Sequence, residues 1–595
     1  EIDLNKRLEK KKNKKNDIFV ENLRNFVGFH WRSNKPEFWE VFDRAEKSHL
    51  ELEDDTECIA NCVLIDDQPK ELDAGFVYSY RFNDQNYKLK EGKAAFDVHQ
   101  IKNIGSIYSI EEKFPDKNIV KIIKKKIDPD IKSQVTFGNG TPPQVHQHDQ
   151  ALNKFLEDYI KNDGKNYKSI MDMLLRTNPD IKNIKNGSHL INKDEDLSTQ
   201  STNIIKNLNN SYLTIQGPPG TGKTYISAKI IIELIKEGKK VGVTSNSHEA
   251  IKNLLIAIEN QAVNQNFEFS GVRKTSRKNK REWNFIKDKY DGKELNMDDY
   301  SLYAGTSWFF VDPRMNKKLD YLFIDEAGQV ALGTTIANAT SAKNLVLIGD
   351  QMQLSQPMRA KHNGYARKSS LDFILENNDT IPAEKGIFLA ITRRLNEKLC
   401  SFISDSFYDS RLTSHEITKT RSVKLNLEPI KNEGLFYVSI DHAGCSQRSD
   451  EETDLVEKTY NKIINKEFKT GNKKGKISSK DIMIVAPYNA QANNIRDRLS
   501  KKYKNDVRVG TIDLFQGQEA KVVLISMATS DVECLPRHKD FFFSRNRLNV
   551  AISRAECVAI IIFNENLLLA PTNSIEEMKL MNNFCKLLKF KINYK

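Results

Sequence analysis

The sequence predicts an α/β protein in which two parallel-sheet domains follow an N-terminal helical segment and a small β-barrel accessory domain. Apolar strands alternate with helices from about residue 200 to 360, and a second such block runs from about 386 to 565. Short β-rich runs from about 50 to 137 indicate the barrel. The predicted divisions are the basic helical segment (1–45), the barrel (46–140), the first parallel-sheet domain with its preceding helices (141–385) and the second parallel-sheet domain with a C-terminal helix (386–595).

The elements before the first parallel sheet are predicted from composition. Residues 1 to 45 are basic, have a helical pattern and contain many aromatic side chains. Residues 76–82 and 94–98 are the clearest β-rich runs of the barrel. A helical pattern then covers residues 144 to 190.

The two parallel sheets are predicted from short apolar runs that are separated by helical stretches. In the first block, the candidate strands are 212–216, 241–245, 321–324 and 345–348. In the second block, they are 435–439, 482–486, 507–511, 521–526 and 558–563. The tail from 574 to 595 has a helical pattern.

Composition limits the class of protein. A chain of 595 residues, 39% of them apolar, is long enough for several buried cores. It contains neither a run of about 18 apolar residues nor a secretory segment, so no membrane span or secretion signal is predicted. The net charge of +12 suits a polyanionic partner such as nucleic acid. Enrichment in Lys, Asn and Ile is also what an AT-rich genome produces, so the charge alone leaves both interpretations open.

The cysteines and histidines do not form a recognisable metal motif. The seven cysteines are scattered, and only Cys58 and Cys62 lie close together, which is not the spacing of a zinc ribbon or an iron–sulfur site. We therefore predict reduced thiols and a cytoplasmic protein. His146, His148 and Asp149 could suggest a metal site, but they stand at an apparent helix start, without a further ligand nearby in the sequence. We interpret them as a polar loop or a helix cap.

The stretch Gly217-Pro-Pro-Gly-Thr-Gly-Lys223-Thr224 has the form G-x-x-x-x-G-K-T, the phosphate-binding loop of nucleoside triphosphatases. It follows a candidate strand and precedes a helical stretch, so the positive end of that helix would face the phosphates. Lys223 would reach the β- and γ-phosphates of ATP, and the Thr224 hydroxyl would ligate Mg²⁺. The predicted phosphate-contacting set is Gly217, Pro218, Pro219, Gly220, Thr221, Gly222, Lys223 and Thr224.

An acidic pair follows the third candidate strand of this block, residues 321–324. Asp325 and Glu326 come directly after the apolar run 321–324. Carboxylates at the carboxyl end of a strand, beside a phosphate loop, can hold a metal ion and activate water. We therefore assign Mg²⁺ ligation to Asp325 and activation of the attacking water to Glu326.

The fourth candidate strand of this block ends in Gly349-Asp350-Gln-Met-Gln353-Leu354, and here the chain resembles the superfamily 1 helicases. The resemblance covers about residues 195 to 565 with the motifs in family order, and it implies two RecA-like motor domains. It places Gln353 at the γ-phosphate and Gln200 at the adenine. Motif five ends at Glu519, which is also assigned to the nucleotide site. In motif six, the final arginine, Arg554, corresponds to the arginine finger.

The resemblance also implies a path for single-stranded nucleic acid along both motor domains. The strand would be contacted by hydroxyl and amide side chains and by backbone N–H groups. Tyr488 could stack on a base or simply pack beside its proline. The candidate contacts are Thr244, Ser245, Asn246, Thr306, Pro487, Tyr488 and Thr511.

The motif style resembles the 5′→3′ branch, superfamily 1B, among its Upf-like members, which place a small β-barrel before the first motor domain. More closely, it resembles the helicase part of bacterial proteins that fuse a RecB-like nuclease to such a helicase. The first residue is Glu1 and residues 1–200 contain no recognisable nuclease cluster, so we expect that nuclease to lie upstream in a longer protein. The fourth motif departs from the family pattern: Arg394 would contact the γ-phosphate, while Arg393 replaces the tyrosine that stacks on the base.

Three functional hypotheses follow. The first is an ATP-driven 5′→3′ helicase or translocase on single-stranded nucleic acid, with DNA favoured over RNA. The second is an ATP-dependent clamp or nucleoprotein remodeller that does not unwind duplexes. The third, a small-molecule kinase with a phosphate loop, is opposed by the motifs that contain Gln353, Glu519 and Arg554.

Overall fold

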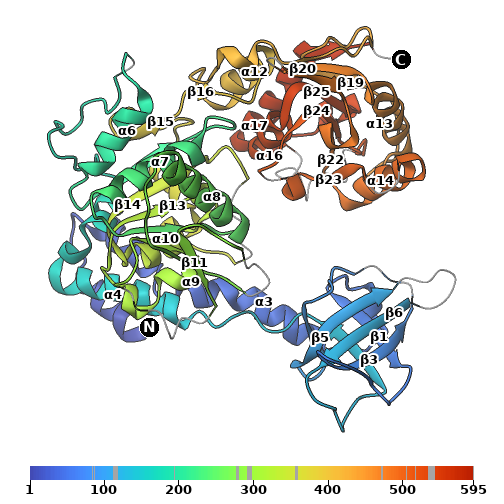
Figure 1. Cartoon of the computed structure of the whole chain (residues 1–595), viewed down its shortest axis with the longest axis horizontal. Coiled ribbons are helices and arrows are strands. Elements are labelled where there is room, and N and C mark those ends of the chain that lie inside the picture. Colours follow the sequence, from blue (N-terminus) through green and yellow to red (C-terminus); the bar gives the residue numbers. More distant parts are fainter. Residues whose placement is uncertain are drawn as a thin grey trace. The chain divides into compact units, whose positions relative to one another are not determined.

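A computed structural model gives the fold of the chain (Figure 1). It divides into two compact units. One unit comprises Gly28–Asp149 and a short segment that ends at His362, and the other comprises Glu1–Val27 and most of the chain after Gln150. The residues that the structure describes are 1–83, 85, 87–111, 118–192, 194–276, 281–290, 296, 298–354, 360–470, 473–503, 506–515, 517–531, 533 and 543–593.

The smaller unit contains the predicted β-barrel. Its antiparallel strands are ordered β1-β7-β4-β5-β6-β3-β2, and a further pairing between β1 and β3 closes six of them into a barrel. Aromatic and aliphatic side chains such as Tyr78, Tyr80 and Phe137 fill its interior. The strands are β1 Cys58–Leu64, β2 Lys70–Leu72, β3 Gly75–Phe82, β4 Ala94–Asp97, β5 Lys102–Glu111, β6 Asn118–Lys124 and β7 Gln134–Gly138.

Helix α3 (Phe29–Glu46) precedes the barrel, and Asp149 caps its first turn. The Asp149 carboxylate accepts the backbone N–H groups of His30 and Trp31, each at 3.1 Å, and lies 3.2 Å from His30 Nδ1. The His362 ring packs on the Phe29 ring, which belongs to the same turn of α3. The motif at 146–149 was interpreted as a polar loop or a helix cap at its own helix start, whereas Asp149 caps a helix more than a hundred residues earlier in the chain.

The larger unit begins with two short helices, α1 (Ile2–Glu9) and α2 (Asp17–Arg24). Asn22 of α2 accepts the backbone N–H of Tyr365 at 2.8 Å, which joins this start to the first parallel-sheet domain. The helical pattern predicted for 144–190 gives α4 (His146–Asn162) and α5 (Lys168–Leu174). Beyond Leu174 the chain is irregular up to α6, so the helical prediction for that stretch is wrong. Asn178, Pro179 and Gly187 disfavour a continuous helix there.

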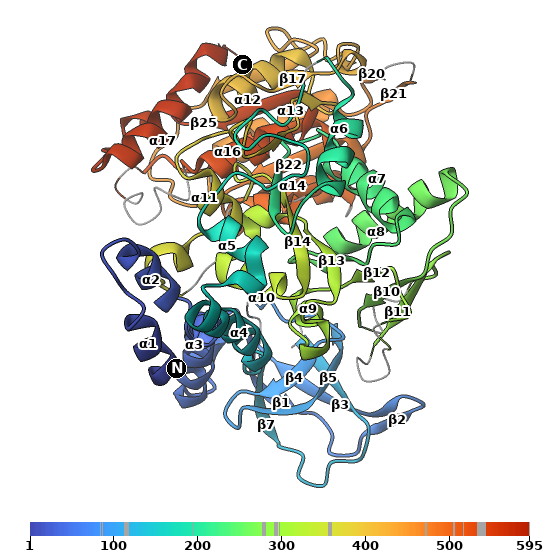
Figure 2. The same cartoon turned by 90° about the vertical axis from the view of Figure 1, so that its left-hand side faces the viewer.

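The first parallel sheet has eight strands in the order β11-β10-β12-β9-β13-β14-β8-β15, and every neighbouring pair is parallel. Figure 2 shows α7 and α8 on one face and α5 and α10 on the other. The strands are β8 Tyr212–Gln216, β9 Val241–Thr244, β10 Gly271–Lys274, β11 Ile286–Lys289, β12 Leu302–Ala304, β13 Leu319–Ile324, β14 Ala342–Gly349 and β15 Gly386–Phe388. The helices are α6 Leu197–Lys206, α7 Lys223–Lys236, α8 His248–Asn264, α9 Ser307–Phe310, α10 Leu332–Ala339 and α11 Ser370–Leu375.

The second parallel sheet has six strands in the order β23-β22-β24-β25-β19-β26. Helices α13 and α14 pack on one face, and α12 and α16 contact the other (Figure 1). The strands are β19 Gly434–Ser439, β22 Ile482–Ala486, β23 Arg508–Thr511, β24 Ala520–Ser526, β25 Ala555–Phe563 and β26 Lys591–Ile592. The helices are α12 Glu397–Phe407, α13 Asp450–Ile463, α14 Asn489–Tyr503, α16 Arg545–Ser553 and α17 Ile575–Cys585. Short ladders outside this sheet are β16 Ile391–Thr392 with β17 Thr413–Ser414, and β18 Ser422–Val423, β20 Glu467–Thr470 and β21 Lys473–Lys476.

Both parallel sheets have cores of β-branched and leucine side chains, because helices cover both faces of each sheet. Among the described helices, none is long and apolar enough to cross a membrane. Six cysteines are free thiols, and Cys534 lies outside the described residues.

Candidate functional site

The phosphate loop connects the end of β8 to the start of α7, as its sequence predicts. Gly217 N donates to the Gly349 carbonyl at 2.9 Å, so the loop starts beside the end of β14. Gly220 has φ +75°, and a Cβ atom there would lie 2.3 Å from Arg394 Cβ. A side chain at this position would therefore push the fourth motif away from the loop.

Lys223 and Thr224 form the first turn of α7. Lys223 Nζ donates to the Gly217 carbonyl, across the loop. Burial lowers the pKa of Lys223, while the carboxylates of Asp350 and Asp325 act in the opposite direction. The Thr224 side chain is exposed at the helix start. A cation and a hydroxyl thus stand where the helix end itself attracts anions.

The acidic pair lies at the same edge of the sheet. Asp325 follows β13, and its N–H donates to Thr244 O at 2.9 Å. Its carboxylate accepts the Glu326 N–H at 2.9 Å, and Glu326 has the left-handed φ of +54°. Burial raises the pKa of Asp325, while Lys223 opposes the shift. A divalent cation would stabilise the ionised carboxylate further, which suits a metal ligand.

The loop after β14 is held by residues of the second parallel-sheet domain. Gln353 Nε2 donates to Asp350 Oδ2 at 3.1 Å, and Tyr408 OH donates to the same oxygen at 2.6 Å. Asn549 of α16 donates to Tyr408 OH at 2.8 Å and to Met352 O at 2.7 Å. Because Asp350, Tyr408 and Asn549 are buried, the network ties the half-buried Gln353 to the helix that carries the sixth motif.

Two arginines of the second domain lie beside this edge. Arg394 Nε donates to Glu519 Oε2 at 2.7 Å. Arg554 is only 2% exposed, and its guanidinium donates to Gln518 O at 3.1 Å. Burial, then the neighbouring Arg394, lowers the pKa of Arg554 to about 9, and Glu326 is among the carboxylates that oppose the shift. Two guanidinium groups held close together, one of them buried, form a site that an anion would stabilise.

The residues present fit a nucleoside triphosphate with Mg²⁺. A Cβ atom at Gly217 would lie 2.3 Å from Lys223 Cγ, so glycine allows the tight turn around a phosphate. Lys223, Arg394 and Arg554 supply positive charge for the phosphates. Thr224 and Asp325 supply the oxygen ligands that Mg²⁺ prefers.

The remaining predicted nucleotide contacts include residues of the loop itself and Gln200 of α6. Thr221 Oγ1 donates to Pro218 O at 2.8 Å, and Thr392 Oγ1 donates to Pro219 O at 2.8 Å. The Gln200 amide of α6 exchanges hydrogen bonds with the backbone of Asn192, each at 2.8 Å. Gln200 therefore fixes the loop before α6, and its adenine contact stays a prediction.

The candidate strand contacts of the first domain follow two neighbouring strands. Val243 of β9 pairs with Ala304 of β12, so the residues after both strands lie at one edge. Thr244 and Ser245 are buried, and Asn246 is exposed with its amide on Gln329 O. Thr306 is half-buried at the start of α9. Thr306 and Asn246 are thus the more accessible members of this group.

The candidate strand contacts of the second domain follow β22 and β23. Ala486 pairs with Thr511, so Pro487, Tyr488 and Thr511 lie at one edge of this sheet. All three are half-buried. Gln491, which the sequence analysis did not assign, is buried and accepts the Ser449 N–H at 2.9 Å. It anchors the segment after β22 to the start of α13.

Sequence reasoning missed the network around Tyr408. Asp350 lies inside the stretch 349–354, where only Gln353 had a predicted role, and neither Tyr408 nor Asn549 was assigned one. Asn546 also belongs to this group, since it donates to Gln351 O at 2.6 Å. The available signal was the polarity of Asn546 and Asn549 on a short helix whose buried residues, apart from Asn549 and Ser553, are apolar.

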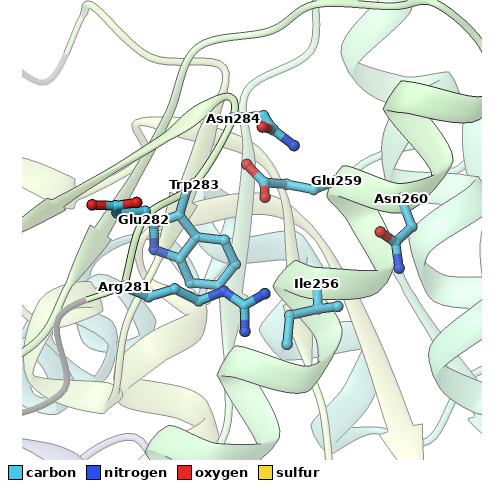
Figure 3. Close-up of a pocket in the computed structure, with 7 residues that line it drawn as sticks. All are labelled: Ile256, Glu259, Asn260, Arg281, Glu282, Trp283 and Asn284. Atoms are coloured by element: carbon cyan, nitrogen blue, oxygen red, sulfur yellow. The ribbon is translucent and has the colours of Figure 1, made fainter.

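A pocket of about 310 Å³ lies elsewhere in the first domain, between α8 and the segment before β11 (Figure 3). The Arg281 guanidinium lies 5.0 Å from the Trp283 ring, and Glu259 accepts the Phe285 N–H at 2.8 Å. Strand β11 forms one edge of the sheet, whereas β8 lies near the other. This pocket is therefore separate from the phosphate loop.

Replacing Tyr408 with phenylalanine is expected to lower the free energy of unfolding by about 1–3 kcal/mol, because Asp350 and Asn549 both lose a partner in a buried position. Denaturant unfolding of the full chain measures this change. The control is Tyr108→Phe on the barrel surface, where the side chain is 48% exposed and little change is expected. Equal losses in the two variants would contradict the role assigned to Tyr408.

Residues 200–358 match a family described as AAA domain, and residues 367–566 match a second family with the same description. The chain is 26% identical over 413 residues to the DNA polymerase alpha-associated DNA helicase A of Schizosaccharomyces pombe, covering 59% of this chain and 61% of that protein. It is 26% identical over 381 residues to the DNA replication ATP-dependent helicase/nuclease JHS1 of Arabidopsis thaliana, covering 60% of this chain and 27% of that protein.

A third relative is the regulator of nonsense transcripts 1 homolog of Neurospora crassa. The two are 24% identical over 524 residues, which is 78% of this chain and 46% of that protein. The chain thus spans between about a quarter and three fifths of the length of these three relatives.

Proposed function

Because the chain belongs to superfamily 1 of the ATP-dependent helicases, we propose that it couples ATP hydrolysis to 5′→3′ movement along single-stranded nucleic acid, with DNA preferred over RNA. The observation that carries the proposal is the network in which Asn549 and Tyr408 hold the loop of Gln353. It joins a predicted γ-phosphate sensor to the helix that ends beside Arg554. Hydrolysis of the nucleotide would therefore alter contacts in both domains.

The chemistry assigned to the residues follows from their positions. Glu326 would orient and deprotonate the attacking water, and Mg²⁺, bound by Thr224 and Asp325, would offset phosphate charge. Lys223, Arg394 and Arg554 would stabilise the charge that spreads over the transferred phosphoryl group. The Arg394–Glu519 ion pair leaves Arg394 oriented within the site before substrate binds. Stacking of the exposed Arg393 on the base is part of the same proposal.

Movement would follow from opening and closing of the two domains. Thr306 and Thr511, together with the polar residues after β9, would contact the backbone of the strand. When γ-phosphate leaves, the contacts of Gln353, Arg394 and Arg554 to it are lost, and the domains would separate. The edge with Tyr488 would then advance relative to the edge with Thr306.

The decisive experiment compares ATPase rates with single-stranded DNA, with single-stranded RNA and without nucleic acid. We expect stimulation by both, and more by DNA. Binding should weaken with salt with a log–log slope of about −0.7 for each phosphate contact. Rates that are equal in all three conditions would contradict a nucleic-acid motor.

Strand displacement tests the direction and the alternative function. A duplex with a 5′ single-stranded overhang should be opened in the presence of ATP, and one with a 3′ overhang should not. A clamp or remodeller without unwinding activity would be stimulated by the strand yet open neither duplex. The match to a helicase/nuclease supports the further proposal that this chain acts together with a nuclease domain.

The double substitution Thr306→Ala and Thr511→Ala is expected to weaken binding of single strands while the unstimulated ATPase rate changes little. Thr306 precedes α9 and Thr511 ends β23, and neither belongs to the phosphate loop or to the residues assigned to the nucleotide, so nucleotide contacts should remain. Fluorescence anisotropy with labelled DNA measures the affinity. Thr413→Ala, at an exposed position in β17, is the matched control. Unchanged affinity in the double variant would remove both residues from the strand path.

A further inference from the structure

A cluster of metal-binding side chains lies in the second domain, in the loop between β19 and α13. His442, Cys445 and Glu451 each bring one ligand atom to within 4.8 Å of the others. The cluster lies apart from the phosphate loop, in another domain, and shares no residue with the nucleotide site. None of its members has a part in the proposed hydrolysis of ATP.

The His442 imidazole is oriented as a metal ligand would be. Its side chain is fully buried, and Nε2 lies 3.1 Å from Glu452 Oε1. The other oxygen of Glu452 accepts hydrogen bonds from Ser526 Oγ at 2.6 Å and from Ala528 N at 2.8 Å. This carboxylate therefore acts as an acceptor in both of these bonds. Nε2 is therefore the protonated nitrogen, and Nδ1 carries the lone pair. Among the described residues, Nδ1 has no hydrogen-bond partner.

This arrangement is the one that metal-binding histidines commonly have. A carboxylate that accepts the proton of one ring nitrogen fixes the tautomer and the ring orientation, and it leaves the other nitrogen for the metal. A buried lone pair without a partner otherwise costs free energy. A cation at Nδ1 would remove that cost.

The Cys445 backbone is fixed beside the histidine. Gly444 has φ +70°, and this turn brings Cys445 back toward His442. Cys445 N donates to Ser530 Oγ at 3.1 Å, and its carbonyl accepts the N–H groups of Ser530 and Asp531 at 2.8 and 3.0 Å. The segment after β24 thereby fixes the backbone of Cys445, and the Cys445 thiol donates to Ala443 O at 3.7 Å.

Glu451 supplies the third group. It lies in the first turn of α13 and is exposed, and one of its oxygens accepts Ser449 Oγ at 2.9 Å. An exposed side chain can turn toward a cation at little cost. The carboxylate would therefore close the remaining distance between the three ligands.

We propose that His442 Nδ1, Cys445 Sγ and a carboxylate oxygen of Glu451 bind one Zn²⁺ ion, with water as the fourth ligand. Mixed nitrogen, sulfur and oxygen ligands suit zinc, whereas Mg²⁺ and Ca²⁺ prefer oxygen alone. Binding releases the thiol proton, so the thiolate and the carboxylate together balance the charge of the cation. The spacing His442-Ala-Gly-Cys445, followed by Glu451, is the sequence signal.

The site has a structural connection to the edge that carries Tyr488. Gln491 Nε2 donates to Ser449 O at 3.2 Å and to Ser526 Oγ at 3.0 Å, so it joins α14 to the groups around Glu452. A bound metal would stiffen the loop before α13 and, through Ser449, this edge. An effect on strand binding rests on the proposed function; the metal site itself does not.

The test is titration of the purified, chelator-treated full chain with Co²⁺ in the absence of nucleotide. A thiolate-to-cobalt charge-transfer absorption that saturates at one ion per chain is expected, and Zn²⁺ should abolish it. Cobalt at the nucleotide site gives no such band, because Thr224 and Asp325 provide only oxygen. Added Zn²⁺ should also raise the thermal unfolding temperature. Absence of the band, or saturation well above one ion, would overturn the proposal.

Variants locate the site. Cys445→Ser should eliminate the band, and Glu452→Gln should weaken metal binding about 10- to 100-fold, as loss of a carboxylate that orients a histidine ligand does. Cys585→Ser, a half-buried thiol in α17, is the matched control and should leave the band unchanged. Circular dichroism and the basal ATPase rate report folding of each variant. If Cys445→Ser retains the band, or Cys585→Ser eliminates it, the assignment is wrong. Failure of DNA to stimulate the ATPase would contradict the proposed function and would leave the proposed metal site unaffected.

Discussion

The Glu326→Gln variant is expected to lose ATP turnover almost completely while it still binds ATP. The carboxylate is the assigned base for water, whereas Lys223, Thr224 and Asp325 hold the phosphates and Mg²⁺. Glutamine preserves the size of the side chain at a residue whose φ is +54°. Steady-state phosphate release measures turnover, and a fluorescent nucleotide analogue measures binding.

Two further variants bracket this result. Lys223→Ala should lose both turnover and nucleotide affinity, because the amine contacts substrate in the ground state as well as in the transition state. Glu237→Gln, at the far end of α7 and paired with Lys206, should behave as the unmodified chain. Near-normal turnover in Glu326→Gln would show that another group activates the water.

The Arg554→Ala variant is expected to lose about 10³- to 10⁵-fold in ATP turnover, the range typical of an arginine finger. Nucleotide affinity should change far less, because the guanidinium opposes charge that develops during transfer. Removal of this buried cation also relieves its repulsion with Arg394. The protein should therefore remain folded, which thermal unfolding can verify.

The matched control is Arg498→Ala, because Arg498 lies in the same domain but pairs with Asp454 at the surface of α14. Single-turnover kinetics separate transfer from product release in both variants. An affinity loss as large as the rate loss would assign Arg554 to ground-state binding instead.

Local patterns predicted most of the two parallel sheets. The strand of residues 212–216 was placed at its observed bounds, and others were placed within a few residues, since buried parallel strands form continuous apolar runs. The glycines of the phosphate loop and the acids after β13 were found because each role needs a short, fixed spacing. Two barrel strands, β3 and β4, were placed within a residue of their observed bounds. The rest of the barrel was predicted only as a region, because its other strands differ widely in length and many of their side chains are exposed or half-buried.

Contacts between distant segments could not be predicted in this way. Tyr408 and Asp350 are 58 positions apart, and Asn549 is 141 positions from Tyr408. Asp149 caps a helix through His30, which lies 119 positions away. A single sequence carries no signal for such pairs, because each residue is locally acceptable as a surface polar group. The buried setting that makes them partners exists only in the folded chain.

The Asp149 cap has a consequence for how the accessory domain could be gained or exchanged. The chain enters the smaller unit at Gly28 and leaves it at Asp149, and the hydrogen bonds from His30 and Trp31 tie these two ends together. Because these two ends already meet, an exchange of residues 28–149 would need only a short joint between Val27 and Gln150, together with a replacement for the contact of Phe29 with the His362 ring. The two chain ends of residues 28–149 are thus joined by a carboxylate that belongs to this same stretch of sequence.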